Sequence, residues 1–269
     1  TPDLYTIREI ARVIKSGHGV CIFPEGMSSI SGANQPVALG TGKLFKHHKV
    51  PVYYSVIRGG YLTSPKYNLR DRVGHVEVEY DQLFTVEDLE RMTPAEIESK
   101  INHAIYHDDY AWNKIHKHHY DIGENGAEDL EDLLFWCPRC GKQHTMATKG
   151  NTIFCTECGN GATLLDTYEL VPFDDTCVIP ETQTAWFNLE REMIRKEVQQ
   201  EDFVLEEQVQ LGMLPEFELL KNQATSEIIG SGTLRLDRTG LSYTGTKNGE
   251  PFTFHIPSVA LPTYGMCTD

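Results

Sequence analysis

Four cysteines in two close pairs are the residues of this sequence with the clearest chemistry. They are Cys137, Cys140, Cys155 and Cys158, which form two Cys-x2-Cys pairs separated by fourteen residues. Two such pairs can present four thiolates to one tetrahedral ion at about 2.3 Å, and a hairpin can span the loop between them. Because cysteine fills all four positions, we expect a structural zinc with no place for a catalytic water. Two disulfides and a rubredoxin-like iron centre are the alternatives.

The residues around the cysteines favour a small zinc ribbon. Gly141 and Gly159 each follow the second thiol of a pair, where a tight turn needs positive φ. A module of roughly 30 residues cannot bury enough apolar surface by itself, so zinc would supply about 10–16 kcal/mol of its folding free energy. His144 lies inside the loop and is expected to be a hairpin residue. Cys21, Cys177 and Cys267 are scattered, and we interpret them as ordinary small apolar residues.

Eight residues near the N-terminus carry a second motif, Ile22-Phe23-Pro24-Glu25-Gly26-Met27-Ser28-Ser29. This segment resembles the Phe-Pro-Glu-Gly-Thr-Arg-Ser block of the 1-acyl-glycerol-3-phosphate (lysophospholipid) acyltransferase family. The context is similar too, because the family places a helix, a glycine and a hydrophobic strand before the block. It places a glycine-containing helix and a Val-Pro-Val strand after it, as at residues 40–52. The resemblance covers about residues 1–110, and some bacterial members of the family carry a zinc ribbon after this domain.

The resemblance implies transfer of an acyl group from acyl-CoA or acyl-carrier protein to a lysophospholipid acceptor. In the family a His-x4-Asp pair, in which His is the general base, precedes the block. The segment before Phe23 has no room for that pair, so we expect the chain to be a fragment that is inactive by itself. The resemblance implies a substrate-binding role for Phe23, Pro24, Glu25, Gly26, Ser28 and Ser29. Glu25 would contact the glycerol moiety or fix the loop, and a carboxylate that only caps a turn is the alternative.

Two residues of the block depart from the family. Met27 replaces Thr, and Ser28 replaces the Arg that in the family helps to hold the acceptor phosphate. The sequence from Gly26 to Arg70 contains no Asp or Glu but has six basic residues, Lys43, Lys46, Lys49, Arg58, Lys66 and Arg70. We hypothesise that Lys43 or Arg58 holds the phosphate, because a phosphate in a cleft needs a charged donor. A basic solvated face is the alternative.

Histidine is frequent between residues 103 and 119, and two His-x4-Asp matches occur there. His103 with Asp108 and His116 with Asp121 both follow the block, which is the wrong order for the family. Residues five apart on a helix also point about 140° from each other, which does not favour a catalytic hydrogen bond. We interpret these histidines as solvated helix positions, with a secondary metal site as the alternative.

Composition and charge limit the partners. The formal charge of −15 argues against a nucleic-acid-binding protein, because such binding draws its free energy from neutralised phosphates. No run of 18 apolar residues is present and no signal peptide is evident. The acyltransferase resemblance implies a cytoplasmic protein that is peripheral to the inner face of the membrane.

The pattern of helices and strands predicts an α/β class. Asp3 would cap a helix that ends at Gly17, followed by a buried strand over 20–23, a helix within 36–48 and a strand over 50–57. Val76, Val78 and Tyr80 alternate with polar residues, as in a strand. Thr93 and Glu96 form a capping box for a helix that would run towards Tyr120.

We predict three parts: the C-terminal part of an acyltransferase domain at 1–121, the zinc ribbon at 122–170 and a helix with a β-rich module at 171–269. The last part has a helix over 182–200 and alternating strands over 232–236, 240–244 and 251–256, which predict an incomplete antiparallel module. A non-catalytic zinc-ribbon protein that binds a partner is the alternative function.

Overall fold

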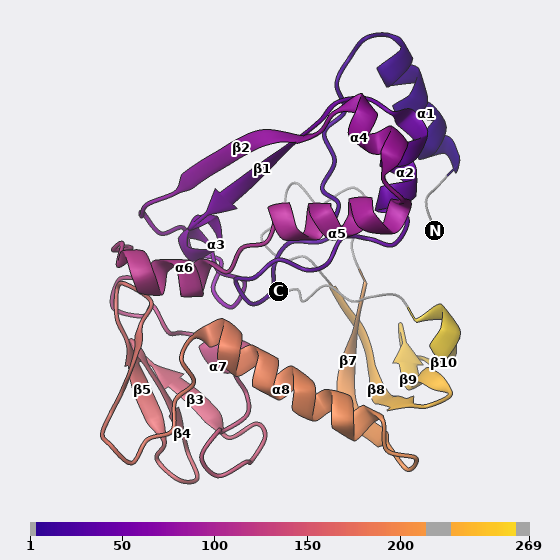
Figure 1. Ribbon diagram of the computed structural model, residues 1–269. Coiled ribbons are helices and arrows are strands. Elements are labelled where there is room, and N and C mark those ends of the chain that lie inside the picture. The colour runs from indigo at the N-terminus through magenta and orange to yellow at the C-terminus, as the bar shows by residue number, and fades with distance from the viewer. Residues whose placement is uncertain (1–3, 214–226, 262–269) are drawn as a thin grey trace. The chain divides into compact units, whose positions relative to one another are not determined.

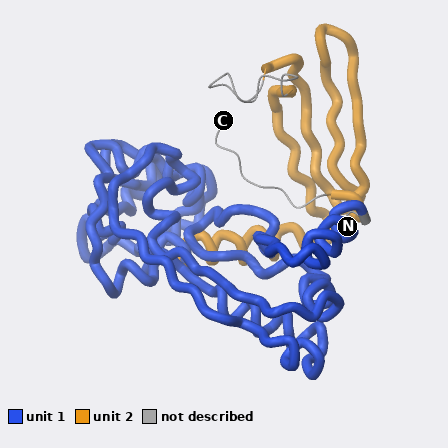
Figure 2. The backbone as a smooth tube through the Cα atoms, turned by 90° about the horizontal axis from the view of Figure 1, so that it is seen from above, with its two compact units in different colours: residues 1–184 blue, residues 185–269 orange. Residues whose placement is uncertain are grey.

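The computed structural model describes residues 4–213 and 227–261. The chain forms two compact units, residues 1–184 and 185–269 (Figure 2). The four-cysteine module belongs to the first unit, together with the N-terminal segment. The contacts therefore divide the chain at residue 184, whereas the sequence analysis places boundaries at 121/122 and 170/171.

The first helix, α1 (Leu4–Lys15), ends as the sequence predicts. Gly17 adopts φ 79°, and the N–H of His18 returns to the carbonyl of Val13 at 3.2 Å. The strand predicted over 20–23 is absent, because this segment runs as irregular chain and the side chain of Phe23 is 86% exposed. A four-residue apolar segment becomes a strand only beside a partner, and none of the described strands pairs with it.

Residues 52–84 of the first unit contain a two-stranded antiparallel ribbon (Figure 1). Strand β1 (Val52–Arg58) pairs with β2 (Glu77–Phe84), and α3 (Gly60–Thr63) lies in the connection between them. The predicted α/β class is thus a mixed fold with antiparallel sheets. Residues before β1 and residues from the end of β2 onwards form a hydrophobic core beside this ribbon: Val37, Leu83, Phe84, Leu89, Ile97 and Ile101.

Three helices surround that core, and side-chain caps set two of their starts. They are α2 (Thr41–His48), α4 (Val86–Arg91) and α5 (Pro94–Ala104). The predicted capping box of Thr93 and Glu96 is present at α5. The helix ends at Ala104 instead of continuing towards Tyr120, because Asp108 caps a new helix, α6 (Asp109–His116), by accepting from the N–H of Ala111 at 3.0 Å.

The four-cysteine module follows the short helix α7 (Leu130–Leu133). Its antiparallel sheet has the order β3-β4-β5-β6, with strands Met146–Lys149, Thr152–Cys155, Gly161–Leu164 and Leu170–Pro172. Two hydrogen bonds join the end of this sheet to earlier chain. The Tyr168 hydroxyl donates to the carbonyl of Leu62 at 2.6 Å, and the N–H of Tyr120 donates to the carbonyl of Asp166 at 2.9 Å. The module is therefore hydrogen-bonded to the preceding part of the same unit.

Helix α8 (Gln183–Val198) and a four-stranded meander complete the described chain. The strands are β7 (Val204–Met213), β8 (Glu227–Asp237), β9 (Gly240–Lys247) and β10 (Glu250–Pro257), and their order in the sheet is β10-β9-β8-β7. A short 3-10 helix, η1 (Ser258–Ala260), follows. The predicted antiparallel strands are present, and β7 is an additional one. Tyr243 is buried and stacks on Phe254 with ring centroids 5.6 Å apart.

Candidate metal centre

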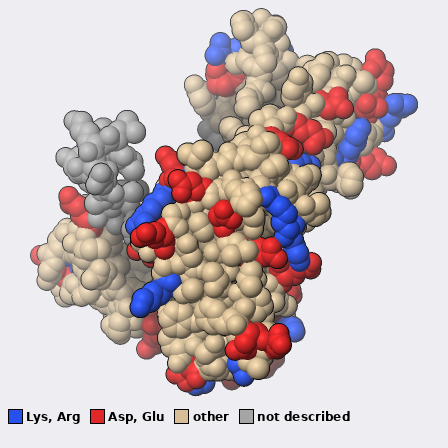
Figure 3. Space-filling model, turned by 90° about the vertical axis from the view of Figure 1, so that its left-hand side faces the viewer, with Lys and Arg blue, Asp and Glu red and all other residues tan. Residues whose placement is uncertain are grey.

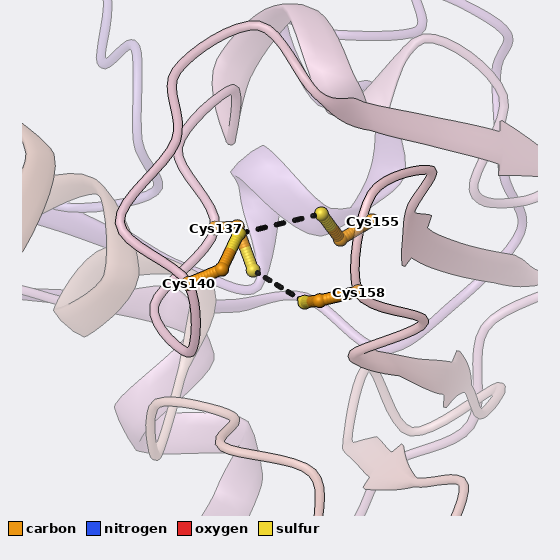
Figure 4. Close-up of side chains that lie close together, drawn as sticks. All are labelled: Cys137, Cys140, Cys155 and Cys158. Atoms are coloured by element: carbon orange, nitrogen blue, oxygen red, sulfur yellow. Dashed lines mark hydrogen bonds between the residues drawn. The ribbon is translucent and has the colours of Figure 1, made fainter.

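The four cysteine side chains converge from two loops, as Figure 4 shows. All four sulfur atoms lie within 4.8 Å of one another, and the sulfurs of Cys137 and Cys158 are 3.6 Å apart. The sulfurs of Cys140 and Cys155 are 3.8 Å apart. Four ligands at about 2.3 Å from a tetrahedral ion are roughly 3.8 Å from one another, so the cage already has the size of a metal–thiolate site. The buried cluster can hold a metal such as zinc.

The two halves of the cage have the same backbone hydrogen bonds. The N–H of Gly141 donates to the carbonyl of Cys137 at 2.9 Å, and the N–H of Gly159 donates to that of Cys155 at 3.0 Å. Both glycines have φ 73°, the left-handed conformation that the sequence predicts at these two positions. Each pair of cysteines is therefore held by a separate tight turn, and the two turns face each other.

Neighbouring polar groups support the cage from outside. The amide of Asn160, which is fully buried, points at the sulfur of Cys137 from 3.8 Å, and the Thr145 hydroxyl lies 3.3 Å from the sulfur of Cys155. Lys142 forms an ion pair with Glu157 and so joins the two turns. Such outer contacts orient metal ligands and stabilise their charge.

The thiols differ in how readily they ionise. Burial raises the pKa of the Cys137 thiol. At Cys155 burial acts in the same direction, but the Thr145 hydroxyl and the backbone N–H of Cys158 outweigh it and lower the pKa to about 6. Metals bind the thiolate form, which the contacts around Cys155 favour and the burial of Cys137 disfavours.

The remaining cysteines lie outside the cage. All four cage cysteines and Cys21 and Cys177 are free thiols, so the structure contains neither of the two disulfides considered as an alternative. Cys21 is exposed and Cys177 is half-buried. Cys267 lies outside the described residues. His144 stacks on Phe135 with ring centroids 5.1 Å apart, as a residue of the hairpin loop.

The segment that resembles the acyltransferase block forms a compact irregular loop. The carboxylate of Glu25 accepts a hydrogen bond from the N–H of Gln35 at 2.7 Å, and the carbonyl of Pro24 accepts from the N–H of Ala38 at 2.7 Å. Gly26 adopts φ 77° at the turn. These bonds close the loop over residues 24–38, and Glu25 thereby fixes it.

The other predicted residues of this segment differ in exposure. The side chains of Phe23 and Ser28 are exposed, whereas the Ser29 hydroxyl donates to the carbonyl of Ala33 at 2.7 Å. Phe23 and Ser28 are therefore accessible from solvent, and Ser29 stabilises the loop internally.

The structure does not bring the two predicted phosphate-binding cations together. Arg58 ends β1 and forms an ion pair with Glu79 at 3.4 Å. Lys43 lies on α2, which packs on α4 beside the other end of the ribbon. The ends of a seven-residue strand are roughly 20 Å apart, so these cations are alternatives for one phosphate. On the face in Figure 3 the coloured Lys and Arg side chains lie singly among Asp and Glu.

Comparisons with known proteins do not extend this description. No protein-family model, no curated protein and no solved structure matches the chain. The acyltransferase resemblance of residues 22–29 therefore stays a prediction. Among the described residues, no helix combines the length and the apolar character needed to cross a bilayer.

Proposed function

We propose that the four-cysteine cluster holds one zinc ion with a purely structural role. The observation that carries this is the sulfur cage itself, in which four thiols converge and no position is left for a water molecule. Iron accepts the same ligands, so metal analysis of the purified chain is the first test. A colourless protein with one tightly held zinc supports the proposal, and a red protein with visible absorbance overturns it.

The second part of the proposal concerns the reaction. The whole protein is a lysophospholipid acyltransferase that is cytoplasmic and peripheral to the membrane, and this chain provides the part that positions the acceptor. Support comes from the residues that resemble the family block and from the loop they form. Glu25 closes that loop through Gln35, while Phe23 and Ser28 remain accessible beside it.

Lys43 is the better candidate for the acceptor phosphate. Its side chain is exposed, whereas Arg58 is engaged by Glu79. The N-terminus of α2 itself is already occupied, because the carboxylate of Glu98 accepts from the N–H groups of Gly40 and Gly42 at 3.0 and 3.1 Å. A phosphate near α2 would therefore rely on the lysine side chain, since those backbone donors are satisfied.

Steady-state kinetics of the full-length enzyme with acyl-CoA and a lysophosphatidate in vesicles test this part. Lys43→Ala should raise KM for the lysophosphatidate about tenfold with little change in kcat, because the lost contact serves binding. Arg91→Ala, which removes an exposed cation paired with Asp88, is the matched control and should leave KM unchanged. If Lys43→Ala and Arg58→Ala both leave KM unchanged, the phosphate-binding role is refuted. Absence of any acyl transfer by the full-length, zinc-loaded protein would refute the enzyme and favour a non-catalytic zinc-ribbon protein.

A further inference from the structure

A second group of metal-ligating side chains lies in the first unit, away from the cysteines. Glu77 is the first residue of β2, His75 lies two residues before it, and His118 follows the end of α6. One ligand atom from each of the three residues lies within 4.8 Å of those of the other two. Two ligand atoms bound to one ion at about 2.1 Å are at most roughly 4.2 Å apart, so the three atoms are near bonding separation, and one histidine ring would rotate out of the stack to close the site.

The side chains of this group are in contact, and one of their nitrogens has no partner within the described part of the chain. Nε2 of His75 lies 3.0 Å from Oε1 of Glu77, and the rings of His75 and His118 stack with centroids 3.9 Å apart. Nε2 of His118 is buried and has no hydrogen-bond partner among the described residues. A buried nitrogen without a partner costs free energy, and a metal ion would satisfy it.

The backbone holds both histidines in place before any ion binds. The Tyr120 hydroxyl donates to the carbonyl of His75 at 2.6 Å. Gly74, which precedes His75, lies so close to Tyr120 that an added Cβ would be 1.9 Å from its ring. On the other side, the buried amide of Asn113 accepts from the N–H of His118 and donates to its carbonyl, both at 2.9 Å. Trp112 supports the His118 ring, with centroids 5.2 Å apart. Such rigid support is what a metal site needs to bind tightly.

The charge around the group also suits a cation. Arg58 lies opposite Glu77 in the β1–β2 register, but its guanidinium pairs with Glu79 instead. The carboxylate of Glu77 therefore faces His75, and 48% of its side-chain surface remains exposed. The net charge of −15 adds a general attraction for cations.

We propose that His75, Glu77 and His118 form a second metal site, for a divalent transition metal such as zinc. Two imidazoles with one carboxylate suit Zn²⁺, Cu²⁺ or Ni²⁺, whereas Mg²⁺ and Ca²⁺ prefer oxygen ligands alone. Three protein ligands leave at least one coordination position open to water or to a ligand from solution. This site therefore differs in kind from the closed cysteine cage.

The proposal is tested by titrating the full chain with Zn²⁺. The protein is first passed over a chelating resin, which removes weakly bound metal and leaves the one equivalent held tightly by the cysteines. We expect one further equivalent. His75→Ala and His118→Ala should each weaken the affinity for this second ion by about 10- to 100-fold or more. Removing only an outer partner of a metal ligand already causes a loss of that size. His119→Ala is the matched control, because this exposed neighbour also pairs with a carboxylate, Asp166, at 2.8 Å. It should bind the second ion as the unmodified chain does.

Two further measurements separate ligation from a structural effect. Cu²⁺ bound to the chain should give an electron paramagnetic resonance spectrum with coupling to two nitrogens, and to one nitrogen in His118→Ala. Glu77→Gln changes a half-exposed strand residue, so it should fold normally and still weaken Zn²⁺ at least about tenfold. Failure of the unmodified chain to bind a second equivalent would refute the site. If His119→Ala lost as much Zn²⁺ affinity as His75→Ala and His118→Ala, the second ion would be bound by histidines without specificity. That result would also refute the site.

Discussion

Arg72 donates a hydrogen bond from Nη1 to the hydroxyl of Tyr168 at 2.6 Å and so joins the ribbon connection to the far end of the cysteine module. The same guanidinium donates to Tyr67 at 3.1 Å and to the carbonyl of Gly126 at 3.0 Å. Its side chain lies over the rings of both tyrosines. Arg72 is only 5% exposed, and the three groups that accept these hydrogen bonds are neutral and come from three separate segments. Burial raises the pKa of Tyr168, which therefore stays protonated beside it.

The first prediction is that Arg72→Ala destabilises the first unit by at least about 3 kcal/mol, since several buried acceptors would lose their donor. Arg72→Lys should also cost more than about 1 kcal/mol, because an ammonium cannot reproduce the forked donors. Denaturant unfolding followed by circular dichroism measures both. Arg91→Ala, at an exposed ion pair with Asp88, should change stability by less than about 0.5 kcal/mol. A loss for Arg72→Ala no larger than that of the control would contradict this account.

The second prediction concerns removal of the metal from the cysteine cage. Cys158→Ser or a strong chelator should release the ion and unfold β3, β4 and β5, because metal binding supplies about 10–16 kcal/mol to such modules. Metal analysis and hydrogen exchange of these strands are the measurements. Cys21→Ser, at an exposed thiol outside the cage, should keep the metal. Strands that stay fully protected without metal would show that the cage is dispensable.

The third prediction is a pH dependence of the β8–β9 turn. Asp237 accepts hydrogen bonds from the N–H and hydroxyl of Thr239 at 2.8 and 2.6 Å and from Arg235 at 3.1 Å. These bonds lower the pKa of Asp237 to about 2. The unfolded chain has an ordinary Asp pKa near 3.9, so this group stabilises the folded turn at neutral pH. The stabilisation should disappear as the pH falls from about 4 to about 2.

Hydrogen exchange of the β8 and β9 amides, measured from pH 7 to pH 2, checks the acid dependence. Asp237→Asn should reduce the protection of these amides at pH 7 and abolish the loss of protection expected below about pH 4. Asp202→Asn, at an exposed turn residue, serves as the matched control and should behave as the unmodified chain. Identical acid profiles for Asp237→Asn and the unmodified chain would show that this carboxylate does not stabilise the turn.

Local sequence signals predicted the parts of the fold that depend on neighbouring residues. The turn glycines Gly141 and Gly159, the stop at Gly17 and the capping box of Thr93 all rest on backbone requirements within a few positions. The four-cysteine cage could be predicted because both pairs have close spacing and one loop joins them. In each case few chain conformations satisfy the local chemistry.

Features that depend on distant partners could not be predicted in the same way. The strand expected over 20–23 is missing because a strand needs a neighbour, which its own residues do not specify. The break before Asp109 could have been found, since Asp108 is a strong helix-capping residue. The group of His75, Glu77 and His118 could be predicted only in part. His118 lies in the histidine-rich segment over 103–119, but His75 and Glu77 lie about 40 residues earlier, just before and at the start of β2.

The bond between Arg72 and Tyr168 has a consequence for the growing chain. Synthesis proceeds from the N-terminus, so Arg72 leaves the ribosome long before its partner, which lies 96 residues further on. Until then a charged guanidinium and the carbonyl of Leu62, whose partner is 106 residues away, must stay hydrated. The core of residues 37–101 can form from its own segment, but the buried polar contacts of Arg72 and Leu62 can form only after Tyr168 has emerged. These two polar contacts would then be completed late, when the cysteine module that carries Tyr168 takes up the metal proposed for it.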